Sequence, residues 1–267
     1  IMIAVLAGLS SATPVFATFH FMVIEEVFPG TPASPTAQYV MLRFTSSGQT
    51  LVAGTVIEVQ DSAGTPLGLF GTFPANVGVA GTLGCAYPNC PALIIGTAAA
   101  QSLLGMTFDV VVDAQVGRVP LPMSGGRVCF RKPASLGSVV DCVAYAAYSV
   151  PNTVATPTQS GCDADFGGAA AALIMGFALD RGTFNCFAKN NVTDFALRFP
   201  RPVANNGTGA TLDTDGDTLV DRLDCGDNDT TSLYPAIEVS TLDLVAGAPP
   251  LLTWPSQSNL SGSSTRY

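Results

Sequence analysis

The chain has 267 residues, a formal net charge of −9 and only 12% charged residues. Its length allows about one to three domains. Lysine occurs only at Lys132 and Lys189, so no basic patch exists to neutralise phosphates, and this excludes nucleic-acid binding. Abundant Gly, Pro, Ser, Thr and Ala favour an all-β extracellular module with many turns.

The first 17 residues form an apolar stretch that ends in Val15-Phe16-Ala17. This ending fits the −3 and −1 preferences of signal peptidase and predicts cleavage after Ala17. The apolar run is too short to span a bilayer, although a buried strand or a short anchor are alternatives. We treat the chain as a fragment open at both ends, with residues 1–17 a signal peptide that lacks its basic n-region. We expect a secreted or outer cell-surface protein with no transmembrane segment in the mature fragment.

Seven cysteines fit disulfides in such a compartment. Proximity along the chain suggests the pairs Cys85–Cys90, Cys129–Cys142 and Cys162–Cys186, with Cys225 left over. A thiolate zinc site is the alternative, but the chain has no C-x-x-C pair and its single histidine, His20, is remote.

Short, partly alternating apolar runs between turn residues predict strands along most of the chain. The predicted strands cover 20–27, 38–44, 55–60, 66–70, 92–95, 108–111, 126–130 and 139–145. Two Ala-rich stretches, 98–104 and 169–175, are candidates for short helical turns. Together these elements predict an all-β protein with an antiparallel sandwich, in which a Cys129–Cys142 bridge would join successive strands.

Several of these segments carry a resemblance to a known family. They are the strand at 20–27, the segment 37–43, the pair 126–130 and 141–145, and the closing segments 177–181, 194–197 and 200–202. With them, residues 18–202 resemble the lamin-tail-like, immunoglobulin-type domain of secreted bacterial proteins. The resemblance implies an immunoglobulin-like sandwich that acts as a binding or structural module. The Cys85–Cys90 insertion and the stretch 169–175 are less typical of that family.

Residues 203–212 are rich in Gly, Asn and Thr and predict a linker at a domain boundary. The next 17 residues, 213–229, hold seven aspartates against Arg222 alone, so most of the net charge is one local feature. Counted from Asp213, oxygen ligands fall at the positions of an EF-hand-type calcium loop. The predicted ligands are Asp213, Asp215, Asp217, the carbonyl of Leu219, Asp221 and Asp224.

This loop departs from a sensor EF-hand in two positions. Thr218 stands where glycine normally makes the sharp turn, and Asp224 replaces the longer bidentate glutamate. We therefore expect modest affinity for Ca²⁺. The continuation adds Asp227 and Asp229 as a second site or an outer shell. Residues 213–236 resemble the thrombospondin type 3 repeat and a related metal-binding motif of bacterial surface proteins; a solvated acidic linker is the alternative.

Two further strands are predicted at 238–245 and 251–254. With Trp254 in the second, residues 237–267 resemble the truncated start of a fibronectin type III-like domain; an unstructured tail is the alternative.

Catalytic groups are sparse. A Ser-His-Asp mechanism would depend on His20, and Glu25 and Glu26 should point to opposite faces of a strand. Asp163 and Asp165 lack a partner base, and Asn191–Thr193 is a glycosylation sequon. We expect a non-enzymatic protein whose calcium loop stiffens a joint between domains. The alternatives are an accessory region of a secreted hydrolase, or an adhesin for extracellular carbohydrate or protein.

Overall fold

The structure is a computed structural model. It describes residues 21–45, 49–78, 91–132, 139–151, 167–182, 190–205, 209–210, 212, 243–245 and 251–253. The predicted signal peptide, His20, five of the seven cysteines and the Asp-rich loop lie outside these residues.

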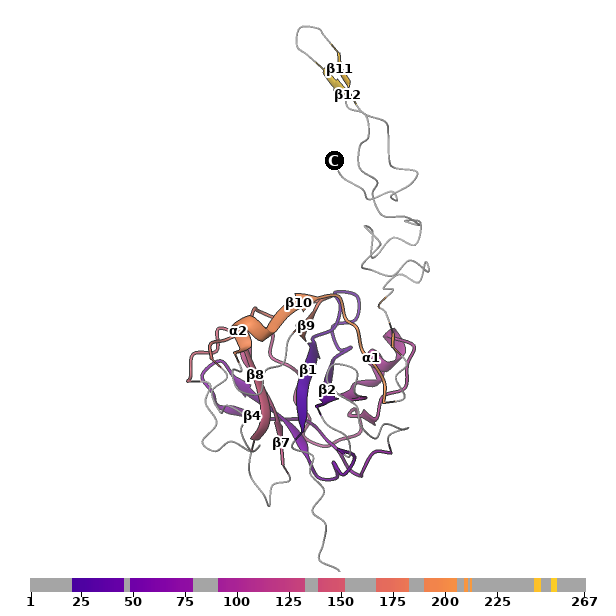
Figure 1. Cartoon of the computed structure of the whole chain (residues 1–267), viewed down its shortest axis with the longest axis vertical. Coiled ribbons are helices and arrows are strands. Elements are labelled where there is room, and N and C mark those ends of the chain that lie inside the picture. The colour runs from indigo at the N-terminus through magenta and orange to yellow at the C-terminus, as the bar shows by residue number, and fades with distance from the viewer. Residues whose placement is uncertain are drawn as a thin grey trace, which may run out of the picture.

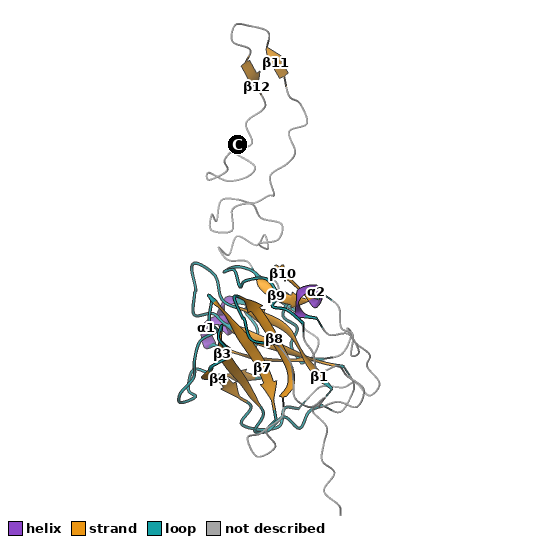
Figure 2. Ribbon diagram, turned by 90° about the vertical axis from the view of Figure 1, so that its left-hand side faces the viewer, coloured by secondary structure: helices purple, strands orange, loops and turns teal. Residues whose placement is uncertain are grey.

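Two β-sheets face each other in a sandwich (Figures 1 and 2). The six-stranded sheet has the order β10-β9-β1-β2-β5-β6, with β1 Met22–Phe28, β2 Tyr39–Phe44, β5 Ala92–Gly96, β6 Val110–Val111, β9 Ala178–Arg181 and β10 Phe195–Arg198. The four-stranded sheet has the order β4-β3-β7-β8, with β3 Val56–Asp61, β4 Pro66–Thr72, β7 Gly125–Arg131 and β8 Val139–Ala146. Their paired strands are antiparallel apart from β5 and β6.

The predicted all-β sandwich is confirmed, and each strand predicted between 20 and 145 has a counterpart. The helical turn predicted at 98–104 is α1 (Ala98–Leu103), which begins where the Thr97 side chain accepts a hydrogen bond from Ala100 N. The helical turn predicted at 169–175 is wrong. Ala170 instead exchanges backbone hydrogen bonds with Ala144 and Ala146 at the edge of β8, so pairing with the sheet overrides the helix preference of alanine.

Beyond the sandwich, β11 (Asp243–Val245) and β12 (Leu251–Thr253) pair antiparallel, as strands were predicted there. The short α2 (Asn191–Asp194) precedes β10 and was not predicted.

The six-stranded sheet is covered on both faces, which explains why β1, β2 and β5 are entirely buried. Val40, Leu42 and Ile95 point into the core between the sheets. Their neighbours Tyr39 and Met41 instead belong to a second apolar cluster, on the opposite, outer face of this sheet. Each large apolar side chain buried in this way stabilises the fold by about 1.5–3 kcal/mol.

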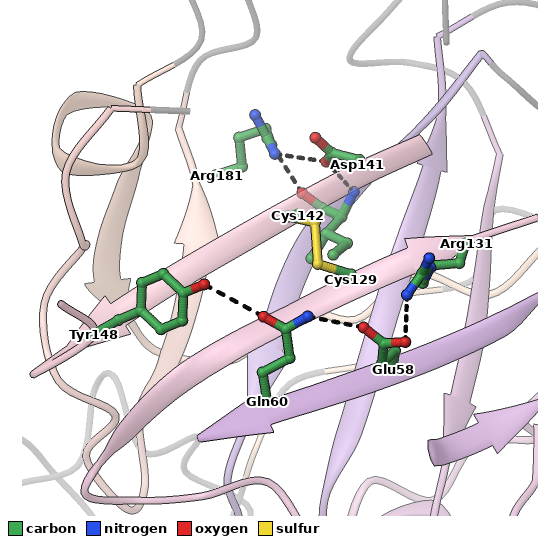
Figure 3. The surroundings of a disulfide bond; sticks show 9 residues. Glu58, Gln60, Cys129, Arg131, Asp141, Cys142, Tyr148 and Arg181 are labelled. Atoms are coloured by element: carbon green, nitrogen blue, oxygen red, sulfur yellow. Dashed lines mark hydrogen bonds and ion pairs between the residues drawn. A yellow bond between two sulfur atoms is a disulfide. The ribbon is translucent and has the colours of Figure 1, made fainter. Parts of the chain in front are cut away.

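A disulfide and a buried ion pair lie on opposite faces of the four-stranded sheet (Figure 3). The predicted Cys129–Cys142 bridge is confirmed; it joins directly opposed residues of β7 and β8 on the face turned away from the other sheet. On the face between the sheets, Arg181 Nη2 on β9 donates to Asp141 Oδ2 on β8 at 2.7 Å. Arg181 Nε donates to the Ile24 carbonyl at 2.8 Å, and Ile24 N donates to Asp141 Oδ2 at 2.8 Å. This inner cluster ties β8 of one sheet to β1 and β9 of the other.

The prediction that Glu25 and Glu26 point to opposite faces is wrong. The pairing of β1 with β2 shifts register between Ile24 and Glu26, which marks a β-bulge. Ile24 and Val27 both point into the core between the sheets. The two glutamates between them therefore share the outer face.

Candidate functional site

The eight predicted calcium ligands, Asp213, Asp215, Asp217, Leu219, Asp221, Asp224, Asp227 and Asp229, all lie outside the described residues. The structure therefore neither brings them together nor separates them. Within the described ranges, no group of three or more His, Cys, Asp or Glu side chains is arranged to hold a metal ion. What the structure does describe is the segment that leads into the loop, so the candidate site is built from there.

The described residues 199–205, 209–210 and 212 form a C-terminal strap. The strap lies against the outer face of the six-stranded sheet. At its start, the ring of Phe199 packs on Phe177 with centroids 5.0 Å apart. At its end, Leu212 is 2% exposed and packs in the second apolar cluster, on the outer face of the sheet. These residues contact the sandwich along the segment that was predicted to be a linker.

The strap contacts a buried carboxyl group of the sheet. Glu26 is 0% exposed, its side chain accepts a hydrogen bond from the Tyr39 hydroxyl, and both its oxygens face the backbone N–H of Arg201, at 3.1 and 3.3 Å. Burial raises the pKa of Glu26 to about 8, and the neighbouring Asp180 adds to this rise. The same burial, together with Glu26, raises the pKa of the Tyr39 hydroxyl. Near neutral pH, Glu26 is therefore mostly protonated.

Asp180 forms a group of buried polar side chains together with Glu26 and Tyr39, which we call the outer cluster. Arg201 Nη2 donates to both Asp180 oxygens, at 2.8 and 3.0 Å, and Arg198 Nε lies 3.3 Å from Asp180 Oδ1. The hydrogen bond to Asp180 raises the pKa of Arg201. One strap residue thus binds Glu26 through its backbone and Asp180 through its side chain. Because the carboxylates of this cluster are buried, it anchors the strap and presents no acid–base pair to solvent.

Further along, the strap is held by polar and apolar contacts. Val203 N lies 3.3 Å from Met41 Sδ, and Asn205 Nδ2 donates to Asp109 Oδ1. Burial raises the pKa of Asp109, whose other oxygen accepts from Ile94 N at 2.8 Å. Ala210 N donates to Pro202 O at 3.0 Å, which folds the strap back on itself. The last described residue before the Asp-rich loop is Leu212, so the chain enters the loop from a buried anchor.

A groove of about 550 Å³ lies between β4, an edge strand of one sheet, and β6, an edge strand of the other. Its lining includes Leu69, Asp109, Val111, Val116 and Arg118. The sequence analysis did not predict this groove.

The sequence held a signal for the outer cluster. Glu25, Glu26 and Asp180 interrupt otherwise apolar runs in a chain with few charges, and charges are rarely buried without partners. The groove had no such signal, because its walls come from segments far apart in sequence. The sequon residue Asn191 is 2% exposed, so the folded chain does not present it to a glycosylating enzyme.

Comparison with protein-family models gave no match, and no curated protein matched the chain. Within the described part, no helix has the length and apolar character needed to cross a membrane.

Proposed function

We propose that this chain is a secreted or cell-surface, non-enzymatic sandwich protein whose Asp-rich loop binds Ca²⁺ and stiffens the joint after the sandwich. The observation that carries the proposal is the position of the loop. Its first predicted ligand, Asp213, directly follows the buried Leu212. A cation held there would be coordinated by a chain whose entry point is already fixed.

The physical argument concerns repulsion between carboxylates. Five ligand aspartates within twelve residues destabilise any compact arrangement of the segment without a cation. Ca²⁺ accepts six to eight oxygens in flexible geometry and removes that penalty. The strap before the loop is bound to the sandwich. A loop ordered by Ca²⁺ would therefore be held rigidly relative to the sandwich, and would not be an ordered segment on a free chain.

One further observation supports the extracellular setting, and two support the structural role. The Cys129–Cys142 disulfide is of the kind that persists in oxidising compartments. The resemblance of residues 18–202 to lamin-tail-like domains and of 213–236 to thrombospondin type 3 repeats supports a structural role. The loop departs from sensor EF-hands at Thr218 and Asp224, which supports stiffening rather than signalling.

The test is calorimetric titration of the full chain with CaCl₂, together with thermal melts in calcium and in chelator. We expect a dissociation constant of about 0.1–1 mM, as in extracellular modules. Calcium at tenfold excess over that constant stabilises by about 1.4 kcal/mol, which raises Tm by roughly 3–5 °C.

Two matched double variants test whether calcium binding requires the predicted ligands or only the negative charge of the region. Asp215→Asn with Asp217→Asn should abolish the binding heat. Glu238→Gln with Asp243→Asn removes the same charge outside the predicted ligands and should leave it intact. Absence of binding heat in the unmodified chain at millimolar calcium would contradict the proposal.

A further inference from the structure

The groove between β4 and β6 is built on a close approach of the two sheets. At Gly71 on β4, an added Cβ would lie 2.5 Å from Val112 Cγ1 and 2.8 Å from Ile95 Cδ1. Only glycine allows β4 to come this near to β5 and the segment after β6. This packed contact lies next to the groove and holds β4 close to the strands of the other sheet.

The loop after β6 closes the free edge of β4. The amide of Gln115 pairs with the backbone of Thr72, accepting from N at 2.7 Å and donating to O at 2.8 Å. Val119 N donates to Leu69 O at 2.9 Å. These bonds block strand addition at Leu69 and Thr72. A ligand must therefore be recognised by side chains.

Three apolar side chains line the groove and remain open to solvent. Leu69, Val111 and Val116 are 37%, 38% and 103% exposed. They come from β4, β6 and the following loop, so they form a surface on both sides of the groove. Exposed apolar surface around a concave site is typical of a binding site.

Arg118 supplies the polar element. Its Nη1 is buried and has no hydrogen-bond partner within the described structure. The closest carboxylate oxygen recorded for its guanidinium is Asp113 Oδ1, 4.0 Å from Nη2, which is beyond hydrogen-bonding distance. Asp113 Oδ2 already accepts from Ala98 N at the start of α1. The Arg118 side chain as a whole is 24% exposed and lines the groove, so its accessible N–H groups can donate to a ligand oxygen there.

The other charged group of the groove does not compete for this role. Both oxygens of Asp109 accept hydrogen bonds, from Ile94 N and from Asn205 Nδ2 in the strap. The groove therefore presents one cationic donor beside apolar walls. Among the lining residues that the structure describes none is aromatic, so these residues offer no ring on which a base or a sugar could stack.

We propose that this groove binds an extended peptide segment that carries an apolar side chain next to a carboxylate. The apolar side chain contacts Leu69, Val111 and Val116, and the carboxylate accepts from Arg118. The volume of about 550 Å³ exceeds that of a single side chain and lies in the range of ligand sites. This site is independent of the calcium loop.

The test uses fluorescence anisotropy with the full chain and short fluorescein-labelled peptides of Val and Leu. One probe carries an internal Asp and a C-terminal amide, the second carries Asn in place of Asp, and the third has no Asp but a free C-terminal carboxylate. We expect saturable binding of the first or third probe, and roughly tenfold weaker binding of the Asn probe, as loss of a charge-assisted hydrogen bond implies. The first and third probes distinguish a side-chain carboxylate from a chain terminus.

Arg118→Gln should remove the difference between the Asp and Asn probes, and Val116→Asp should abolish binding. Val116 is fully exposed, so this second variant keeps the fold. The matched controls are Val192→Asp, at another exposed valine (57% exposed), and Lys132→Gln, which removes one positive charge beyond the end of β7. Both should bind as the unmodified chain does. No saturable binding of any probe up to millimolar protein, or equal binding by Arg118→Gln, would overturn the proposal.

Discussion

The two buried charge clusters use the same residue types for opposite purposes. In the inner cluster, Arg181 and Asp141 have side chains 1% and 0% exposed and neutralise each other between the sheets. In the outer cluster, Glu26 lies near Asp180, another carboxylate, and its pKa rises to about 8. Arg201 neutralises Asp180 by two hydrogen bonds from its side chain, but it meets Glu26 through a backbone N–H.

The two clusters therefore differ in whether the buried carboxyl group is paired with a guanidinium group. The buried Arg181–Asp141 ion pair of the inner cluster joins the two sheets directly. A buried carboxyl without a guanidinium partner changes its protonation near neutral pH. The attachment of the strap, and hence the base of the Asp-rich loop, depends on that protonation.

The largest expected effect comes from breaking the inner cluster. Arg181→Met leaves Asp141 buried without its cation and should lower the free energy of unfolding by about 3–5 kcal/mol. Chemical denaturation measures it. Arg198→Met, at a side chain 48% exposed beside Asp180, should cost about 0–1 kcal/mol. Equal losses in the two variants would show that the clusters do not differ as described.

The next effect is a pH dependence confined to the outer cluster. Glu26 titrates near 4.5 when unfolded and near 8 when folded, so the folded state binds more protons across this window. Stability from this group is complete at low pH and is lost as pH rises from about 4.5 to about 8. The loss amounts to a few kcal/mol, at about 1.4 kcal/mol per pKa unit.

Glu26→Gln should remove this component. Denaturation of both proteins at intervals from pH 4 to 9 measures it as the difference between their curves. Parallel curves across the whole range would contradict the raised pKa of Glu26.

The smallest effect concerns the far end of the strap. Leu212→Ala removes a buried apolar side chain and should cost about 2 kcal/mol. We expect the strap to open before the sandwich unfolds, so that hydrogen exchange at the Ala210 amide accelerates more than exchange in β2. Leu67→Ala, at a side chain 47% exposed, should change stability by less than about 0.5 kcal/mol. Uniform acceleration across the sandwich would show that strap and sheet unfold as one unit.

The sandwich was predictable because its strands carry local signals. Runs such as 38–44 and 126–130 are apolar, short and bounded by turn residues, and the pairing of Cys129 with Cys142 follows from adjacent strands. These features depend on neighbours in sequence, so they can be read without knowing the fold.

The errors arise where distant segments decide the local structure. Ala170 joins the edge of β8 instead of forming a helix, and the β1 bulge moves Glu25 and Glu26 to one face. The linker at 203–212 stays a prediction, and no local sequence signal indicated that Val203 and Leu212 pack on a sheet formed far upstream. The calcium ligands at 213–229 remain a prediction.

The position of β1 in the middle of its sheet has a consequence for synthesis. One neighbour, β2, follows it at once, but the other, β9, begins at Ala178, and Arg181 reaches back across 157 residues to the Ile24 carbonyl. A growing chain cannot complete this sheet until β9 and β10, which ends at Arg198, have been made. Folding dominated by such distant pairings takes on the order of milliseconds to seconds. The central strand β1 therefore lacks one of its two partners until late in synthesis.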